Sequence, residues 1–328
     1  MPIMKYIHAA ALFLLIAIVF YSNITIMDSL VTVRSIEQAI SSVKSSAVVS
    51  KLQRMLMYEE RYKYLPPKPY TNHSARYDLC GVGPNYDPFF TRERKERYQI
   101  SSANREDETI YTIFFKGDTQ VMGSVVEIGA YNGLQESNSH FYEVCLGWET
   151  LLVEGNTMLW EQIVANRPHA HRLSYAPSCS EEDEQANKTV KFDKYPMTNA
   201  GLADGTVKTS YSGRNYTIDV PCGSFNNVLL DILNGHVTFF SLDVEGAEPF
   251  VLQNIDFKRI FVDIMMVESS NNICERNCKS RKAYRKIMLD EGYILFDGMV
   301  HKSDVFIHPL SKHLKTAEKK GYTPSTYH

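Results

Sequence analysis

The stretch SVVEIGAYNG, residues 124–133, joins a short apolar run to a turn that contains two glycines. An apolar run bounded in this way is typical of a strand that is buried on both faces of a parallel sheet. In the ExGxxxG pattern that begins at Glu127, Gly129 lets a ligand approach the turn, and Gly133 lets the following helix pack closely. The spacing differs from the GxGxxG that favours a pyrophosphate. Alone, the pattern also fits a turn that merely needs two glycines.

On both sides of this stretch, apolar runs alternate with helical patterns. The predicted strands are residues 124–128, 150–154, 171–175, 238–243 and 261–268, followed by an antiparallel pair at 293–296 and 304–307. The predicted helices are residues 135–146, 158–166, 248–254 and 280–291. This order predicts an α/β fold with a mostly parallel, seven-stranded sheet and helices on both faces.

Acidic residues end the predicted strands 150–154 and 238–243. Glu154 comes 21 positions after Gly133, and in doubly wound folds a carboxylate at about this distance holds ribose hydroxyls. A surface glutamate is the alternative. Asp243 and Glu245 follow another strand and are expected at the same edge of the sheet, where ligands bind. Glu245 and the nearby Glu248 also fit a simpler role as favourable charges at a helix amino terminus.

Five motifs in this order together resemble the FkbM-type methyltransferases, over residues 101–309. They are DETIYTIFFK (107–116), VVEIGAYNGLQESNSHFYE (125–143), LGWETLLVEGN (146–156), SLDVEGAE (241–248) and VDIMMVE (262–268). The resemblance implies a Rossmann-like class I methyltransferase fold and S-adenosylmethionine as the cofactor. With its apolar amino terminus, the chain is most similar to the membrane-anchored eukaryotic branch, which includes the Star-like proteins.

The resemblance also implies a cofactor site. Glu127, Gly129 and Gly133 would shape its methionine end, and Glu154 would bind the ribose. Asn156 would line the same site, although the family often has proline at the next position, where this chain has Thr157. The loop 176–178, which ends at Ser178, would flank the adenine.

Asp243 would then lie nearest the transferred methyl group, with Glu245 as a partner on the acceptor side. For an alcohol acceptor, a carboxylate could orient the hydroxyl and take its proton. We therefore expect an O-methyltransferase that acts on a hydroxylated acceptor such as a glycan. The alternative is a non-catalytic adaptor in secretory trafficking, in which the methyltransferase fold only binds cargo. The glycine spacing disfavours a nicotinamide oxidoreductase.

The amino terminus indicates where this activity would take place. Residues 6–27 carry no charge until Asp28 and are long enough for a signal anchor, with a cleaved signal peptide as the alternative. Sequons at Asn23, Asn72, Asn187 and Asn215, together with six cysteines, favour a lumenal body. We expect a single-pass type II protein of the endoplasmic reticulum or Golgi. Residues 1–5 would be a cytoplasmic tail, and residues 28–77 would be a helical stem and linker. A homodimer could form through this stem. Residues 78–310 would be the methyltransferase domain, and residues 311–328 a flexible tail.

The cysteines and the net charge bear on disulfides, metal binding and nucleic-acid binding. Cys179 and Cys222 bracket an irregular insertion and are predicted to form a bridge, with two separate buried thiols as the alternative. Cys274 and Cys278 are predicted to form a local disulfide, because no matching ligand pair suggests zinc. We expect no metal site. A formal charge of -3 argues against a nucleic-acid partner.

Overall fold

The computed structural model describes residues 47–70, 102–116, 122–193, 217–269 and 274–326. The chain divides into two compact units, Met1–Gln53 and Arg54–His328. Of the first unit, only residues 47–53 are described, and they form the beginning of a helix. The architecture below is that of the second unit.

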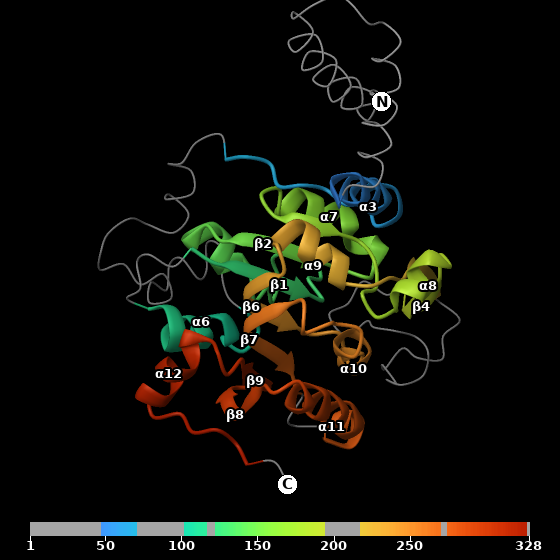
Figure 1. Cartoon of the computed structure of the whole chain (residues 1–328). Helices are drawn as coiled ribbons and strands as arrows, with labels where there is room; N and C mark the ends of the chain where they lie inside the picture. Colours follow the sequence, from blue (N-terminus) through green and yellow to red (C-terminus); the bar gives the residue numbers. More distant parts are fainter. Residues whose placement is uncertain (1–46, 71–101, 117–121, 194–216, 270–273, 327–328) are drawn as a thin grey trace, which may run out of the picture. The chain divides into compact units, whose positions relative to one another are not determined.

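Seven strands form one sheet in the order β3-β2-β1-β6-β7-β9-β8 (Figure 1). The strands are β1 (Ser124–Ile128), β2 (Glu149–Val153), β3 (His171–Leu173), β6 (His236–Leu242), β7 (Phe261–Glu268), β8 (Ile294–Val300) and β9 (Ser303–Ile307). All neighbours pair in parallel except β9, which is antiparallel to both β7 and β8. The predicted mostly parallel sheet with an antiparallel pair at its end is confirmed.

Helices pack on both faces of the sheet. The described helices are α3 (Ala47–Arg61), α6 (Glu106–Ile110), α7 (Trp160–Asn166), α8 (Glu181–Gln185), which belongs to the insertion, α9 (Asn226–Leu233), α10 (Glu248–Leu252), α11 (Cys274–Asp290) and α12 (Lys312–Lys319). Two π-helices, η1 (Tyr111–Phe115) and η2 (Tyr142–Leu146), and a 3₁₀ helix, η3 (Thr157–Leu159), complete them. One core cluster joins α9, α10, α11 and the aromatic end of α3 to alternate strand residues such as Val126 and Phe240. The other joins η1, η2 and α12 to the intervening residues, such as Val125 and Phe239. This alternation is what a sheet buried on both faces requires.

The second half of α3 belongs to the body rather than to a separate stem. Tyr58 and Tyr62 are fully buried, and the ring of Tyr62 stacks on that of Tyr175 at a centroid distance of 4.1 Å. After the helix, the backbone of Leu65 pairs in both directions with Arg172 of β3. The expectation that the body begins at residue 78 is therefore wrong, because apolar burial and backbone pairing include residues from Arg54 onward.

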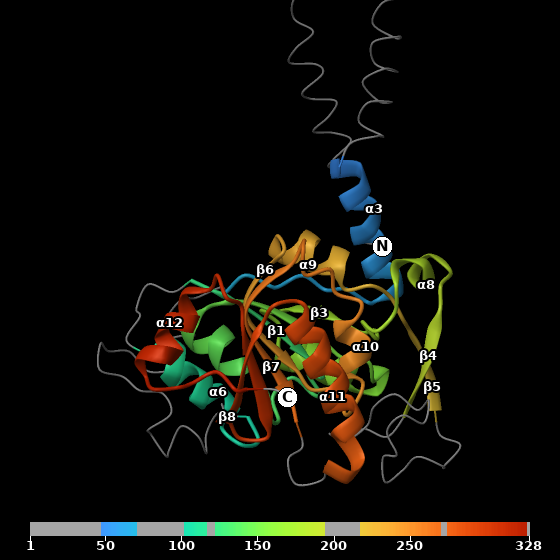
Figure 2. The same cartoon turned by 60° about the horizontal axis from the view of Figure 1, so that its bottom comes forward.

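The insertion between residues 180 and 221 is less irregular than expected. It contains α8 and an antiparallel hairpin of β4 (Thr189–Asp193) and β5 (Thr217–Pro221), which stands to one side of the main sheet (Figure 2). The predicted disulfide joins Cys179 to Cys222. Cys145 is disulfide-bonded as well, to a partner outside the described side chains. The side chains of Cys274 and Cys278 also lie outside them, so their predicted bridge stays a prediction.

Two other elements differ from the sequence prediction. The helix expected at residues 135–146 begins only at His140, because the preceding serines bond to a strand carboxylate instead of continuing a helix. Residues 312–319 of the supposedly flexible tail form α12, in which Ser311 caps the amino end and Ala317 is buried. The expected tail thus closes one face of the core.

The predicted anchor at residues 6–27 lies outside the described residues, as do the sequons at Asn23, Asn72 and Asn215. Within the part of the chain that is described, no helix has both the length and the apolar character needed to cross a bilayer.

Candidate functional site

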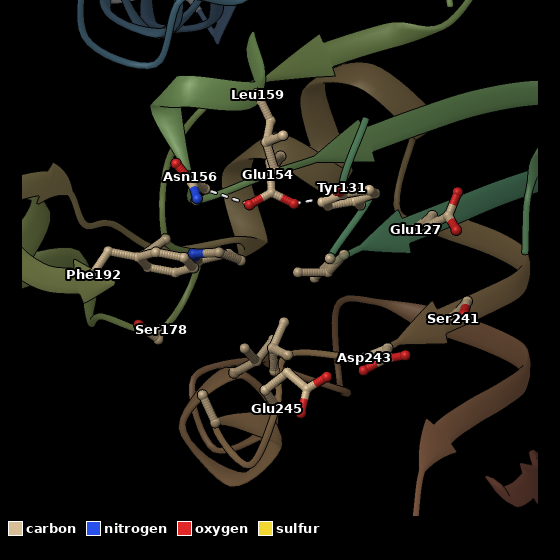
Figure 3. Close-up of a pocket in the computed structure, with 18 of the residues that line it drawn as sticks. Glu127, Tyr131, Glu154, Asn156, Leu159, Ser178, Phe192, Ser241, Asp243 and Glu245 are labelled. Atoms are coloured by element: carbon tan, nitrogen blue, oxygen red, sulfur yellow. Dashed lines mark hydrogen bonds between the residues drawn. The ribbon is translucent and has the colours of Figure 1, made fainter. Parts of the chain in front are cut away.

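A pocket opens where β1, β2 and β6 end, and residues at the ends of all three strands line it. Figure 3 shows Glu154 near the middle, with Phe192 and Ser178 on one side and Glu127, Ser241 and Asp243 on the other. The position agrees with the rule that ligands of open α/β sheets bind beyond the carboxyl ends of the strands.

Glu154 is positioned by backbone amides. One carboxylate oxygen accepts the amide of Tyr131 at 2.8 Å and the other accepts the amide of Asn156 at 2.6 Å. Each oxygen retains a lone pair that can accept a hydroxyl. Burial nevertheless raises the pKa of Glu154 to about 7, although the two amide hydrogen bonds act in the opposite direction. The predicted ribose-binding carboxylate thus lies in the pocket and is held in place without a ligand.

Asn156 and Ser178, two further predicted cofactor residues, also line the pocket. The side chain of Asn156 caps the turn η3 by accepting the amide of Met158 at 3.1 Å. Ser178 lies beside the disulfide-bonded Cys222, with 3.6 Å between Oγ and Sγ. Both are therefore placed by local contacts of their own.

The two glycines of the first turn act differently. Gly129 has a φ of +89°, and a Cβ there would stand 1.8 Å from the carbonyl oxygen of Asp243. Only glycine therefore lets the β1 turn lie against the end of β6. Gly133 also has a positive φ, but a Cβ there would meet the side chain of Arg167 at 2.8 Å. Gly133 is not among the pocket-lining residues, so it affects the site only through packing.

Glu127 lines the pocket, but its carboxylate is hydrogen-bonded to other residues of the protein. It accepts hydrogen bonds from the hydroxyls of Ser137 (2.8 Å) and Ser139 (2.5 Å) and from the amide of Asn138 (2.6 Å). Asn138 also lines the pocket, and its Oδ1 is buried without a hydrogen-bond partner among the described residues. A donor on a bound ligand, such as the ammonium of a methionine moiety, would satisfy this oxygen. In this respect the pocket fits the cofactor that the sequence predicts.

Asp243 and Glu245, the predicted catalytic pair, lie together at the opposite end. Glu245 has a φ of +56°, so its side chain is presented from a left-handed turn. Glu268, at the end of β7, joins them, and one oxygen from each of the three carboxylates lies within 4.8 Å of the others. Such a group could hold a metal ion, which the sequence did not suggest. The expectation of no metal site stays a prediction.

The carboxylates of this cluster raise one another's pKa. Burial is the main cause, and mutual repulsion adds to it, so the pKa values of Glu245 and Glu268 rise to about 8. Burial and the adjacent Glu268 raise the pKa of Asp243 well above its usual range. Hydrogen bonding between Asp243 and Glu268 raises the pKa of Asp243 and lowers that of Glu268. At neutral pH the cluster therefore retains protons and can exchange them.

Two residues of the site, Glu268 and Phe192, were not predicted from the sequence. Glu268 ends an apolar strand just as Glu154 and Asp243 nearly do, and that common position could have identified it. Phe192 lines the pocket from the hairpin, and no pattern in the sequence predicted this position. Glu248, by contrast, stabilises the start of α10. Its carboxylate accepts hydrogen bonds from the amide of Gly246 at 2.9 Å and from the hydroxyl of Ser280 at 2.9 Å.

Comparison with known proteins gives one family and several solved structures. The model of the methyltransferase FkbM domain matches residues 127–295. A methyltransferase FkbM structure from Methylobacillus flagellatus is similar at 13% identity and a TM-score of 0.31, over 65% of this chain and 50% of that one. A fibrillarin pre-rRNA processing protein of Methanococcus jannaschii is similar at 10% identity and a TM-score of 0.32, over 58% of this chain and 66% of that one, just under two thirds.

An Aeropyrum pernix fibrillarin with natively bound S-adenosylmethionine is similar at 10% identity and a TM-score of 0.32. The match covers 60% of this chain and 71% of that one. No curated protein matches the chain.

Proposed function

The chain belongs to the FkbM methyltransferase family, and from that premise we propose that it transfers a methyl group from S-adenosylmethionine to a hydroxyl of an acceptor such as a glycan. The main observation behind the proposal is that the carboxylates at the two ends of one pocket have different surroundings. Glu154 is held ready by two amides, and across the pocket lie carboxylates whose pKa values are raised. The first suits the recognition of a nucleoside, and the second suits the removal of a proton.

The residues of this chain would divide the work accordingly. Glu154 would accept the ribose hydroxyls, and the acceptor hydroxyl would lie against Asp243 or Glu245. When bound, S-adenosylmethionine supplies a methyl group on a positively charged sulfur. The carboxylate of Asp243 or Glu245 would take the proton of the acceptor hydroxyl as the methyl group is transferred. Once ionised, Glu245, whose pKa is about 8, is a stronger base than an ordinary glutamate.

The proposal also places the body in the secretory pathway, on the lumenal side of an amino-terminal anchor. Two observations support this placement. The structure has a disulfide between Cys179 and Cys222, and disulfides persist in oxidising compartments. The sequon residue Asn187 is exposed in a left-handed turn just before β4, where a glycan could be attached. A protease-protection assay on microsomes tests the placement, and digestion of the body without detergent would refute it.

Calorimetry of the full-length protein with S-adenosylmethionine tests the cofactor assignment. We expect binding by the wild type and a loss of at least tenfold in the Glu154→Ala variant, since two hydroxyl acceptors are removed. Glu161→Ala, an exposed position on the neighbouring α7, is the matched control and should bind like the wild type. If the wild type showed no binding, the adaptor alternative would replace the enzyme.

A further inference from the structure

Phe192 reaches the pocket from outside the main sheet. It lies on β4 of the inserted hairpin, yet it lines the same pocket as Glu154. Its ring covers Gly155, the residue after Glu154, so closely that a Cβ on Gly155 would stand 2.6 Å from the ring atom Cε2. An aromatic face is therefore placed one residue away from the carboxylate assigned to the ribose.

The geometry of a nucleoside determines which end of the pocket its base would occupy. Its base is attached to the ribose carbon next to the one that bears the 2′-hydroxyl. If Glu154 holds the hydroxyls and the reacting end faces Asp243, the base extends in the other direction. Figure 3 shows Phe192 and Ser178 at that other end. The apolar residues Ala176 and Pro177, which directly precede Ser178, also line the pocket.

The hairpin that carries Phe192 is fixed at its foot. Cys222, which directly follows β5, is bonded to Cys179, and the amide of Ala176 donates to the carbonyl of Pro221 at 2.9 Å. The guanidinium of Arg61 in α3 donates to the carbonyls of Glu184 (2.5 Å), Lys188 (2.9 Å) and Cys222 (3.0 Å). These contacts fix the foot of the hairpin, and Phe192 is paired with Ile218 in its ladder rather than lying on a loop.

We propose that Phe192 is the side chain that stacks on the purine of the cofactor, so that the inserted hairpin determines affinity at the nucleoside end. The inference rests on the proposed function. Stacking of a base on an aromatic ring contributes enough to binding that its loss is readily measured. An exposed pair on the same hairpin, Lys191 and Asp219, offers a comparison position that does not line the pocket.

The test is calorimetry of the full-length protein with S-adenosylhomocysteine, which binds without turnover. We expect Phe192→Ala to weaken binding by about ten- to a hundredfold. Phe192→Trp should keep the affinity, because the indole also offers a stacking face. Lys191→Ala, the matched control, should stay within twofold of the wild type. Thermal unfolding of each variant shows whether the fold is retained.

The Phe192→Trp variant gives a second and more direct readout. A purine stacked on the new indole should quench its fluorescence, beyond any change that the wild type shows from its own two tryptophans. If the wild type binds while Phe192→Ala binds within twofold of it, or if Phe192→Trp binds without added quenching, the inference is wrong and the proposed function stands. If the wild type does not bind S-adenosylhomocysteine, the proposed function fails and this inference with it.

Discussion

The two ends of the pocket place their carboxylates in opposite ways. At the end proposed for the nucleoside, Glu154 has one backbone amide for each oxygen. At the end proposed for the acceptor, one oxygen from each of Asp243, Glu245 and Glu268 lies within 4.8 Å of the others. Backbone amides hold the first carboxylate in place, whereas repulsion among the other three carboxylates is lowered by a proton or a cation. The same kind of side chain can therefore be fixed by the backbone at one end of a pocket and kept easy to protonate at the other.

The largest expected effect on stability comes from Gly129, where the turn after β1 lies against the end of β6. Gly129→Ala would place a Cβ 1.8 Å from a backbone oxygen of Asp243, so the strand ends must separate. We expect a loss of more than about 3 kcal/mol in the free energy of unfolding, from overpacking added to the cost of a positive φ. Urea unfolding measures it.

Gly292→Ala separates these two costs. Gly292 has a φ of +83° and nothing within 4 Å of its Cβ position, so this variant carries only the conformational cost, about 1 kcal/mol. Equal losses in the two variants would show that the close contact of the strand ends has no energetic weight.

The cluster of Asp243, Glu245 and Glu268 is expected to make the stability of the fold depend on pH. Glu245 and Glu268 have folded-state pKa values of about 8, above the value of about 4.3 in an unfolded chain. The folded state therefore binds more protons, and stability falls as the pH rises from about 5 through 8. Glu268→Gln removes one charge and should keep about 2 kcal/mol more stability than the wild type at pH 9, with little difference at pH 5.

Urea unfolding at the two pH values measures this difference. Glu318→Gln, at an exposed position of α12, removes the same charge without relieving the cluster, and its profile should follow that of the wild type. Parallel profiles for all three proteins would mean that the carboxylates do not repel one another in solution.

The smallest expected effect is the pH dependence of cofactor binding at the preformed end. Ribose hydroxyls are best accepted by an ionised Glu154, whose pKa is about 7. Affinity for S-adenosylhomocysteine should therefore rise about tenfold between pH 6 and pH 8. Calorimetry at both pH values checks it. Glu154→Gln should bind more weakly and with a flatter profile; a wild type without pH dependence would argue that Glu154 is not the ribose ligand.

Much of the sheet and most of the site could be predicted because both depend on local patterns. The apolar runs define the strands, and Glu154 and Asp243 follow directly from where those runs end. The start of the helix near residue 140 could not be predicted, because it depends on serines that bond to Glu127 across the turn. Phe192 was missed for a similar reason, since only the pairing of β4 with β5 brings it to the pocket.

The aromatic end of α3 shows the same limit. Tyr58 and Tyr62 have the spacing of an ordinary helix face, and the sequence does not reveal that the face packs on Tyr175 of the body. A pattern identifies an amphipathic helix but not its partner. In the described part of the predicted stem, the helix is confirmed, but its residues from Arg54 onward belong to the body.

The pairing of Leu65 with Arg172 has a further consequence for how the protein can be divided. Strand β3 lies at the border of the sheet, and the segment after α3 occupies the hydrogen-bonding groups that this border would otherwise present. A fragment that began at residue 78 would lose that cover as well as the buried tyrosines. Its uncovered strand would offer a template to the same strand of another molecule, and edge-to-edge aggregation is the expected result.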